Sequence, residues 1–539
     1  MVNEFSILIG GKAGDGIDKA SLVIANILNR LGYYIYIYRD YPSIIRGGHT
    51  FSIIRASKNK IFTHNNAVDV VLALNKETIE LHIKRLKPVS VIVYDPKVIG
   101  DALTSLGKDQ KNLAVPVSAI IKEEDAPPVT SNSVLIGALV KVLGIKWSVL
   151  EDVFRKKLLK ATDKNLAVAR RGYDETEICL QAQDLNREGR PLINANEALG
   201  LGLVKGGLHT YIAYPMTPTS NVLHFMADNA DDFGLKVIHP ESEIGVILMA
   251  LGCSYTGENV AVGTSGGGFC LMAEGYSFSA MAEIPVVVVL GQRPGPSTGL
   301  PTYSSQTELH FALNAGQGEF TRLVIAPGDA EESYFWAQMA ILAAAKYRIP
   351  VIILTDKNLG EGIYSFDAKS TVTVPKLPVN EVKNVFKVNS YEHDENGITT
   401  EDPIITKTMQ DKRLAKTKDL ANELDKYDLV GVYGNQKSTT AILCWGSNKG
   451  VCVEAADSLG LKVIQPVVMS PFPVEQFKKA IDGVEKLIAV ENNATGQLVR
   501  LIKEYGFDAD QTVQKYDGRA FSIDEMEKEL SAIIKGQKT

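Results

Sequence analysis

Two acidic residues near the middle of the chain are spaced so that one of them could serve a ligand. Glu241 and Glu243 stand at the predicted start of a helix that continues through Ile244 to Leu251. Residues at positions i and i+2 point about 200° apart around a helix, so the two carboxylates cannot face the same ligand. One is therefore predicted to be functional and the other to be a surface or capping charge favoured by the helix N-terminus. A helix start with two exposed acids is the alternative.

Arg293 follows the apolar run Ile284 to Leu290, which is typical of a strand buried on both faces. Ligand-binding residues gather at the carboxyl ends of such strands, and the arginine fork suits a carboxylate. An ion pair with a structural acid is the alternative. Thr217 lies between Pro215 and Pro218, which hold its hydroxyl on a rigid loop. Alternatively, Thr217 caps the next helix. Taken alone, the motif favours this capping role over a functional hydroxyl.

The elements that must position these residues alternate between strands and helices. A helix is predicted at Ala195 to Lys205, and strands at Thr210 to Ala213 and Val351 to Thr355. The segment Gly263 to Phe269 is typical of a strand that turns into a helix, where missing side chains let backbone approach a ring or another subunit. A third α/β region is predicted from the strands Thr440 to Trp445, Lys462 to Gln465 and Lys486 to Val490.

The N-terminal region is predicted to form a strand, a glycine turn and a helix. The apolar run Phe5 to Gly10 leads through Gly14 and Gly16 into a periodic segment, Ile17 to Leu31. The glycine spacing is not that of a dinucleotide fingerprint, and a plain turn and anion binding at the helix start remain equal alternatives. Arg46, beside two glycines, could bind an anion or lie in a solvated turn. The rest of this region alternates between strands and helices, which predicts a largely parallel sheet. The predicted strands are Tyr33 to Tyr38, Phe51 to Arg55, Val68 to Leu74 and Val89 to Tyr94, and the predicted helices are Lys76 to Arg85 and Ser133 to Leu143.

Composition narrows the possible classes of protein. A chain of 539 residues should hold several domains, and its net charge of -6 argues against non-specific nucleic-acid binding. The five cysteines form no pair or cluster at metal-binding spacing, so no metal site is assigned to this chain and a reducing compartment is expected. No apolar run approaches membrane-spanning length. We therefore expect a cytoplasmic protein without membrane contact.

Four motifs in order resemble the pyrimidine-binding domain of the thiamine-dependent 2-oxoacid:ferredoxin oxidoreductases. They are Tyr214-Pro215-Met216-Thr217-Pro218, Pro240 to Glu243, Gly263 to Phe269 and Gln292 to Gly299, with Met216 and Gly267 departing from the usual isoleucine and proline. The N-terminal region looks like the gamma-type domain of the same family, and Glu491-Asn492-Asn493 lies in a region similar to the transketolase C-terminal domain. The resemblance implies an α/β protein with a gamma-type domain at 1–186, a pyrimidine-binding domain at 191–370, a polar connector at 371–425 and a transketolase C-terminal-like domain at 426–539.

The resemblance also implies roles for individual residues. Glu243 would activate thiamine, by a hydrogen bond to the aminopyrimidine ring that lets the cofactor take up its own C2 proton. Arg293, assisted by Thr217, would hold the carboxylate of a 2-oxoacid. Further implied contacts are Tyr214, Pro215 and Gly266 with the cofactor, Ser297 and Thr298 with the substrate, and Gly14, Gly16 and Arg46 with the phosphates of coenzyme A.

One expected part of the thiamine site is missing from the chain. The motif that holds the diphosphate begins with Gly-Asp-Gly and ends with asparagines that bind magnesium. Gly14-Asp15-Gly16 resembles its start. The segment where the asparagines should follow, Arg39 to Arg46, contains none, and Asn65 comes too late. The diphosphate, Mg²⁺ and a 4Fe-4S cluster are therefore expected on a beta subunit. Together the two chains would convert pyruvate, 2-oxoglutarate or both to acyl-coenzyme A and CO₂ and reduce ferredoxin.

Two alternatives remain at this stage. A self-sufficient transketolase-like enzyme would need the diphosphate motif in this chain. A non-catalytic scaffold or coenzyme A-binding regulatory subunit would keep the folds and lose the pocket chemistry, against which the joint presence of Thr217, Glu243 and Arg293 argues.

Overall fold

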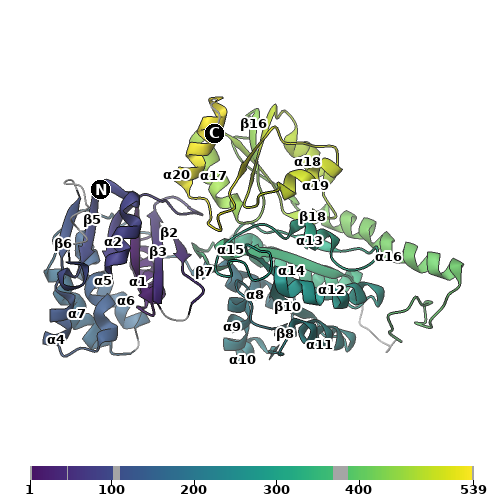
Figure 1. The fold of residues 1–539 in the computed structure, drawn as a ribbon, viewed down its shortest axis with the longest axis horizontal. Helices are drawn as coiled ribbons and strands as arrows, with labels where there is room; N and C mark the ends of the chain where they lie inside the picture. The colour runs from purple at the N-terminus through teal and green to yellow at the C-terminus, as the bar shows by residue number, and fades with distance from the viewer. Residues whose placement is uncertain (1–2, 45–46, 101–109, 159, 368–386, 537–539) are drawn as a thin grey trace. The chain divides into compact units, whose positions relative to one another are not determined.

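The computed structural model describes residues 3–44, 47–100, 110–158, 160–367 and 387–536. The chain divides into two compact units (Figure 1). The first contains Met1–Leu192, Gly362–Asp367 and Ser522–Ala532, and the second contains Ile193–Glu361, Ala368–Phe521 and Ile533–Thr539. Among the described residues, no helix combines the length and apolar character needed to cross a bilayer.

The first unit is built on an eight-stranded sheet. Its order is β6-β5-β4-β1-β3-β2-β14-β7. The strands are β1 (Glu4–Ala13), β2 (Tyr34–Asp40), β3 (Gly47–Ser57), β4 (Val68–Ala73), β5 (Leu86–Tyr94), β6 (Lys111–Ala114), β7 (Leu192–Asn194) and β14 (Ile363–Ser365). The helices are α1 (Ile17–Arg30), α2 (Lys76–His82), α3 (Pro96–Ile99), α4 (Val117–Glu123), α5 (Ser131–Val142), α6 (Trp147–Lys157) and α7 (Thr162–Asp174), and α20 (Ile523–Ile534) begins in this unit.

This sheet is mixed, so the prediction of a largely parallel sheet is wrong for half of it. Strands β4, β5 and β6 continue β1 in parallel, whereas β3 pairs antiparallel with both β1 and β2. The connection between Asp40 and Gly47 is too short for the crossover of a dozen or more residues that parallel neighbours need. The strands themselves lie close to the predicted ranges.

The second unit contains a seven-stranded sheet in the order β18-β12-β13-β11-β10-β8-β9. Its strands are β8 (Thr210–Ala213), β9 (Lys236–Ile238), β10 (Val260–Ser265), β11 (Val286–Gln292), β12 (Leu323–Ile325), β13 (Pro350–Asp356) and β18 (Val468–Ser470), and only β18 pairs antiparallel. The helices are α8 (Ala195–Lys205), α9 (Ser220–Asp228), α10 (Ala230–Phe233), α11 (Glu243–Tyr255), α12 (Gly266–Met281), α13 (Leu309–Asn314), α14 (Ala330–Tyr347) and α15 (Lys357–Glu361).

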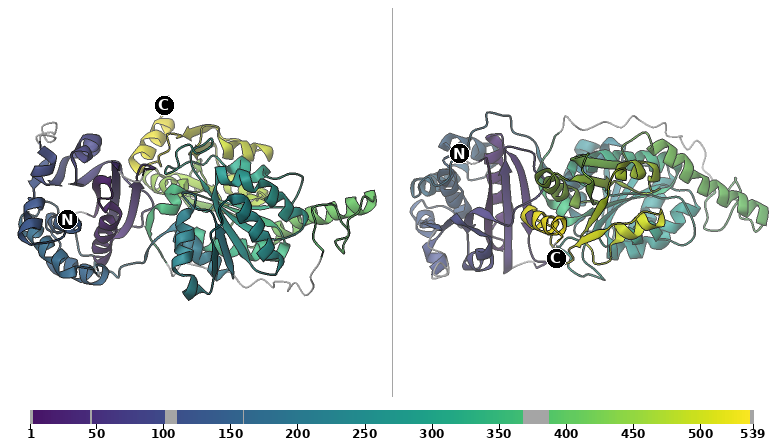
Figure 2. Two further views of the ribbon diagram at one scale, coloured as in Figure 1. Left: turned by 60° about the horizontal axis from the view of Figure 1, so that its bottom comes forward. Right: turned by 90° about the horizontal axis from the view of Figure 1, so that it is seen from above.

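Helices cover both faces of this sheet, as Figure 2 shows in the teal part of the chain. Along β11, Val286, Val288 and Leu290 pack in one apolar core with α11 and α12, while Val287 and Val289 pack in another core with α8, α9 and α14. Successive side chains of a strand point to opposite faces, so a strand in a central layer needs an unbroken apolar run. The continuous run predicted from the sequence is thus explained by burial on both sides.

The C-terminal part of the second unit forms a five-stranded sheet, as the sequence predicted for its central strands. The order is β15 (Val430–Gly434), β17 (Lys462–Pro466), β16 (Thr440–Leu443), β19 (Lys486–Glu491) and β20 (Gln511–Gln514). Its helices are α17 (Asn448–Leu459), α18 (Val474–Ile481) and α19 (Gln497–Glu504), and α16 (Pro403–Leu424) precedes them. Residues 371–386 of the predicted connector lie outside the described residues.

A buried lysine joins the two sheets of the second unit. Lys449 of α17 donates hydrogen bonds of 2.5 Å to Asp329 and to Glu332 at the start of α14. Burial lowers the pKa of Lys449, but the two carboxylates outweigh it and hold that pKa well above the ordinary value. The lysine is therefore charged, and its removal would leave two largely buried carboxylates without this counter-charge.

We predict that Lys449→Met destabilises the second unit by about 3–5 kcal/mol, the usual effect of breaking a buried ion pair from one side. Thermal unfolding followed by circular dichroism would measure it. Lys407→Met, which removes the exposed partner of Asp411, is the matched control and should leave the melting temperature unchanged. Equal melting temperatures for the two variants would contradict the role given to Lys449.

Candidate functional site

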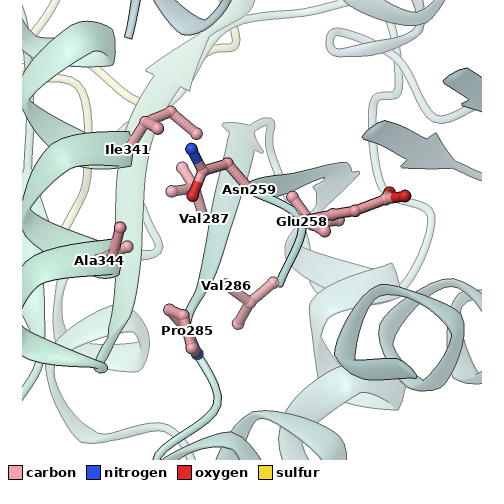
Figure 3. Close-up of a pocket in the computed structure, with 9 residues that line it drawn as sticks. Glu258, Asn259, Pro285, Val286, Val287, Ile341 and Ala344 are labelled. Carbon is pink, nitrogen blue, oxygen red and sulfur yellow. The ribbon is translucent and has the colours of Figure 1, made fainter. Parts of the chain in front are cut away.

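The functional residues predicted in the second unit lie along the carboxyl edge of its seven-stranded sheet. Arg293 directly follows β11, Gly266 follows β10, and the loop with Thr217 follows β8. Ligands of open α/β sheets bind at this edge. A small pocket at the opposite, amino edge is lined by Glu258, Asn259 and apolar residues such as Val286 and Ile341 (Figure 3), and it includes none of the predicted site residues.

Glu243 is buried at the first position of α11, while Glu241 is exposed. Only 4% of Glu243 is accessible to solvent, and its Oε1 atom has no hydrogen-bond partner among the described residues. The atom lies against the backbone of α12, because a Cβ built on Gly268 would be 2.7 Å from it. As expected, one acid faces inward and the other faces solvent, and the inward one has an oxygen available for a ligand.

Arg293 is held by the loop that carries Thr217. Its Nη1 donates a hydrogen bond of 3.0 Å to the carbonyl oxygen of Thr217, and its buried Nε atom has no hydrogen-bond partner among the described residues. Burial lowers the pKa of Arg293, and the charge of Glu308 acts in the opposite direction. The guanidinium is therefore a buried cation with donors left for an anion.

Thr217 is half-buried and does not cap the following helix. Helix α9 begins at Ser220, and its capping position is Thr219. Thr219 itself donates its hydroxyl to the carbonyl oxygen of Thr264 at 3.2 Å, which fastens the loop to β10. The competing interpretation of Thr217 as a helix cap is thus wrong, and its hydroxyl is left for another role.

Glu308 is a member of this site that the sequence reasoning missed. It is buried, with its Oε1 atom accepting a hydrogen bond of 2.9 Å from Thr307 and its Oε2 atom without a partner among the described residues. A Cβ built on Gly266 would lie 2.7 Å from Oε1, so this carboxyl rests on the start of α12 as Glu243 does. Burial raises the pKa of Glu308 to about 7. In the sequence it precedes an apolar segment and looks like an ordinary acid at a helix start, so no pattern singled it out.

The remaining predicted contacts of this region lie at the surface beside the site. Tyr214 and Pro215 are exposed, with the ring of Tyr214 packed edge-on against His239. Ser297 and Thr298 are also exposed, and the carbonyl oxygen of Ser297 would be 3.7 Å from a Cβ built on Gly267. Their assignment to cofactor and substrate stays a prediction.

The coenzyme A candidates belong to the first unit. Gly16 has φ 74° at the start of α1, which favours glycine, and Asp15 closes the turn by accepting a hydrogen bond of 2.7 Å from the amide of Lys12. Gly14 lies in the same turn with open space where a side chain would be. Arg46 lies outside the described residues. Within the described part of the chain, no group of three or more metal-ligating side chains could hold an ion.

Two family models match the chain. Residues 6–175 match the pyruvate ferredoxin/flavodoxin oxidoreductase model, and residues 202–424 match the thiamine diphosphate-binding model of pyruvate flavodoxin/ferredoxin oxidoreductases. The second match contains Thr217, Glu243, Arg293 and Glu308. The region gathered at the carboxyl edge of the sheet is thus a thiamine diphosphate-binding domain.

Known proteins are similar over the whole chain or over more than half of it. The 2-oxoacid:ferredoxin oxidoreductase subunit alpha of Saccharolobus solfataricus is 29% identical over 99% of both chains. The 2-oxoglutarate synthase subunit KorA of Archaeoglobus fulgidus is 30% identical over 58% of this chain and 90% of its own. The structure of the 2-oxoglutarate:ferredoxin oxidoreductase from Magnetococcus marinus, with 2-oxoglutarate, coenzyme A and succinyl-CoA bound, superimposes with a TM-score of 0.90 at 26% identity, covering 99% of this chain and 100% of that one.

The fold, the buried glutamate and arginine at its sheet edge, and these similarities agree. The chain belongs to the alpha subunits of the 2-oxoacid:ferredoxin oxidoreductase family.

Proposed function

We propose that the chain, paired with a beta subunit, oxidatively decarboxylates a 2-oxoacid with coenzyme A and passes the electrons to ferredoxin. The observation that carries this proposal is the pair of buried groups at one sheet edge, Glu243 and Arg293, each with a polar atom that has no hydrogen-bond partner among the described residues. Burying such atoms costs free energy unless a ligand satisfies them. The proposed compartment is the cytoplasm, as expected from the cysteine pattern.

Glu243 suits a hydrogen bond to the pyrimidine ring of thiamine. Its buried Oε1 atom, which lies against Gly268 at the start of α12, has no hydrogen-bond partner among the described residues. A ring nitrogen that hydrogen-bonds to this carboxyl would supply the partner that its Oε1 atom lacks. Glu243 would hold a proton at that nitrogen and so favour the imino form of the ring.

Arg293 and Thr217 would bind the substrate. The guanidinium is fixed by the carbonyl oxygen of Thr217, so its remaining donors are oriented before the carboxylate arrives. When bound, the thiamine cofactor would supply the carbanion that attacks the 2-oxo carbon. Arg293 would orient the carboxylate for departure as CO₂, while the hydroxyl of Thr217, at the loop surface, would assist it.

The partner subunit is proposed to cover the face beside Glu243. Large apolar side chains are exposed there on α11 and α12, about half-accessible in each case: Ile244, Leu248, Met249 and Leu271. Exposed apolar side chains gathered on one face mark interaction sites. A beta subunit seated on this face would bring the diphosphate, Mg²⁺ and a 4Fe-4S cluster to the buried carboxyl.

Two finer features of the reaction are also proposals. The 2-oxoglutarate bound in the Magnetococcus marinus enzyme supports this acid as a substrate, with pyruvate as the second candidate. Coenzyme A, also bound in that enzyme, would be contacted by the turn with Gly14 and Gly16 and by Arg46. A non-catalytic scaffold is disfavoured, since a scaffold has no need for unpartnered buried carboxyls.

The test is reduction of ferredoxin or viologen by this chain, alone and co-expressed with the beta subunit, using pyruvate and 2-oxoglutarate with coenzyme A. We expect activity only in the pair, because the diphosphate motif is missing from this chain. Activity of the chain alone would overturn the divided site, and inactivity of an assembled pair would favour the scaffold.

We predict that Glu243→Gln lowers kcat by about 10²–10⁴-fold in the assembled pair, since an amide cannot exchange a proton with the ring. Glu241→Gln, at the exposed acid two residues earlier, is the matched control and should keep full activity. Size-exclusion chromatography would verify that both variants still assemble. Equal turnover of the two variants would rule out the role given to Glu243.

We predict that Arg293→Gln raises KM for the 2-oxoacid by about 10–100-fold, the effect of losing one charge-assisted contact of ~1.5–3 kcal/mol. Steady-state kinetics of the pair would measure it. Arg500→Gln removes an exposed arginine on α19 and should leave KM unchanged. An unaltered KM in Arg293→Gln would place the carboxylate elsewhere.

A further inference from the structure

A second buried carboxyl lies close to the arginine proposed to bind substrate. The amide of Glu308 donates a hydrogen bond of 3.2 Å to Gln292 Oε1 at the end of β11, and its Oε1 atom accepts one of 2.9 Å from the neighbouring Thr307. The hydroxyl of Thr307 also lies 3.5 Å from the carbonyl oxygen of Arg293. Glu308 is 9% exposed, and its Oε2 atom has no partner among the described residues. The carboxyl is thus held in place beside Arg293, with one oxygen left over.

The charges that face Glu308 come from several elements. Arg293 at the end of β11 lowers its pKa and Asp356 at the end of β13 raises it, but burial has the largest effect and brings the pKa to about 7. Glu243 of α11 lies against Gly268, two residues along α12 from the glycine that Glu308 contacts. On α13, His310 is engaged by Gln497, with its Nε2 3.0 Å from the carbonyl oxygen of that residue. Among these groups, Arg293 is the one opposite charge that acts on Glu308.

Asp356 does not compete for this arginine. It accepts hydrogen bonds of 3.0 Å from the hydroxyl of Ser304 and from the amide of Leu359. Burial raises the pKa of Asp356, and these donors oppose the shift. Its Oδ1 atom accepts both hydrogen bonds, whereas the Oε2 atom of Glu308 has no partner among the described residues.

We propose that Glu308 is a positioning residue that serves as the counter-charge of Arg293 until substrate binds, and then takes up a proton. This inference rests on the proposed function, in which Arg293 holds the carboxylate of the 2-oxoacid. Two carboxylates cannot share one buried guanidinium without repulsion, so arrival of the substrate favours the neutral form of Glu308. One proton from solvent ends on a Glu308 oxygen, and no bond of the substrate changes in this step.

The proton would return when CO₂ leaves. Loss of the carboxylate removes the repulsion, Glu308 ionises again, and its negative charge again balances that of Arg293. Glu308 would thereby keep the guanidinium oriented between turnovers and prevent it from holding a carboxylate product. Binding of substrate and of this proton are linked, so each strengthens the other.

The experiment is the pH dependence of kcat/KM and kcat of the assembled pair from pH 6 to 9 with saturating coenzyme A. We expect kcat/KM of the wild type to fall toward about tenfold per pH unit above pH 7, because the proton must then be taken from solution. Glu308→Gln should remove this slope. Glu258→Gln, at the amino edge of the same sheet, is the matched control and should retain the slope.

The outcomes separate this inference from the proposed function. If Arg293→Gln leaves KM unchanged, the carboxylate site itself is wrong. If Arg293→Gln raises KM but Glu308→Gln keeps the wild-type slope, only the role of Glu308 is overturned. A merely structural residue would change stability or kcat without flattening the pH profile.

A second measurement covers the case in which Glu308→Gln fails to fold. The wild-type pair would be titrated by calorimetry with oxamate and with N-oxalylglycine, in which an amide replaces the reactive ketone of pyruvate and of 2-oxoglutarate. Heats measured in phosphate and in Tris differ by the protons exchanged with buffer. We expect uptake of about half a proton per site at pH 7 and more at pH 8. Binding without proton uptake would overturn the inference.

Discussion

The start of helix α12 is the constraint on which the site depends. Gly266 and Gly268 present backbone without side chains, and a Cβ at either position would collide with the carboxyl of Glu308 or of Glu243. The close approach removes both acids from water at a cost that only the surrounding packing can offset. Helices on both faces of the seven-stranded sheet provide that packing, so the site is built on a layer that is buried on both sides.

The same layer explains why the charged groups keep their geometry. Arg293 emerges from a strand whose neighbours on both sides are fully buried, and its guanidinium is tied to the loop after β8 by one hydrogen bond. Sites carried by strand ends are held more firmly than sites on free loops. The backbone beneath the edge is rigid, so it cannot rearrange to give these polar atoms a hydrogen-bond partner. They stay available to a ligand.

Much of this arrangement could be predicted from the sequence, and the exceptions have physical causes. Helix α8 and strand β8 match their predicted ranges, since apolar periodicity and turn residues mark them clearly. The antiparallel pairing of β3 was missed because strand direction depends on the length of the connection between β2 and β3. Apolar runs locate the strands but not their ends, so they leave that length undetermined. Glu308 was missed because it lies in an irregular segment, and its burial comes from contacts with residues distant in sequence. The roles assigned to Thr217, Glu243 and Arg293 stay predictions, although the structure places them at one edge.

The pairing of β12 with β18 means that the central sheet is completed late in synthesis. Strand β12 pairs on one side with β13 and on the other with β18, which follows it by more than a hundred residues. During synthesis the outer edge of β12 stays unpaired until the residues that form β18 have left the ribosome. Contacts of such long sequence separation form late and slow folding. A fragment that ends before β18 would leave a bare strand edge, so we expect the thiamine-binding region to be expressed best with the segment that forms β18 attached.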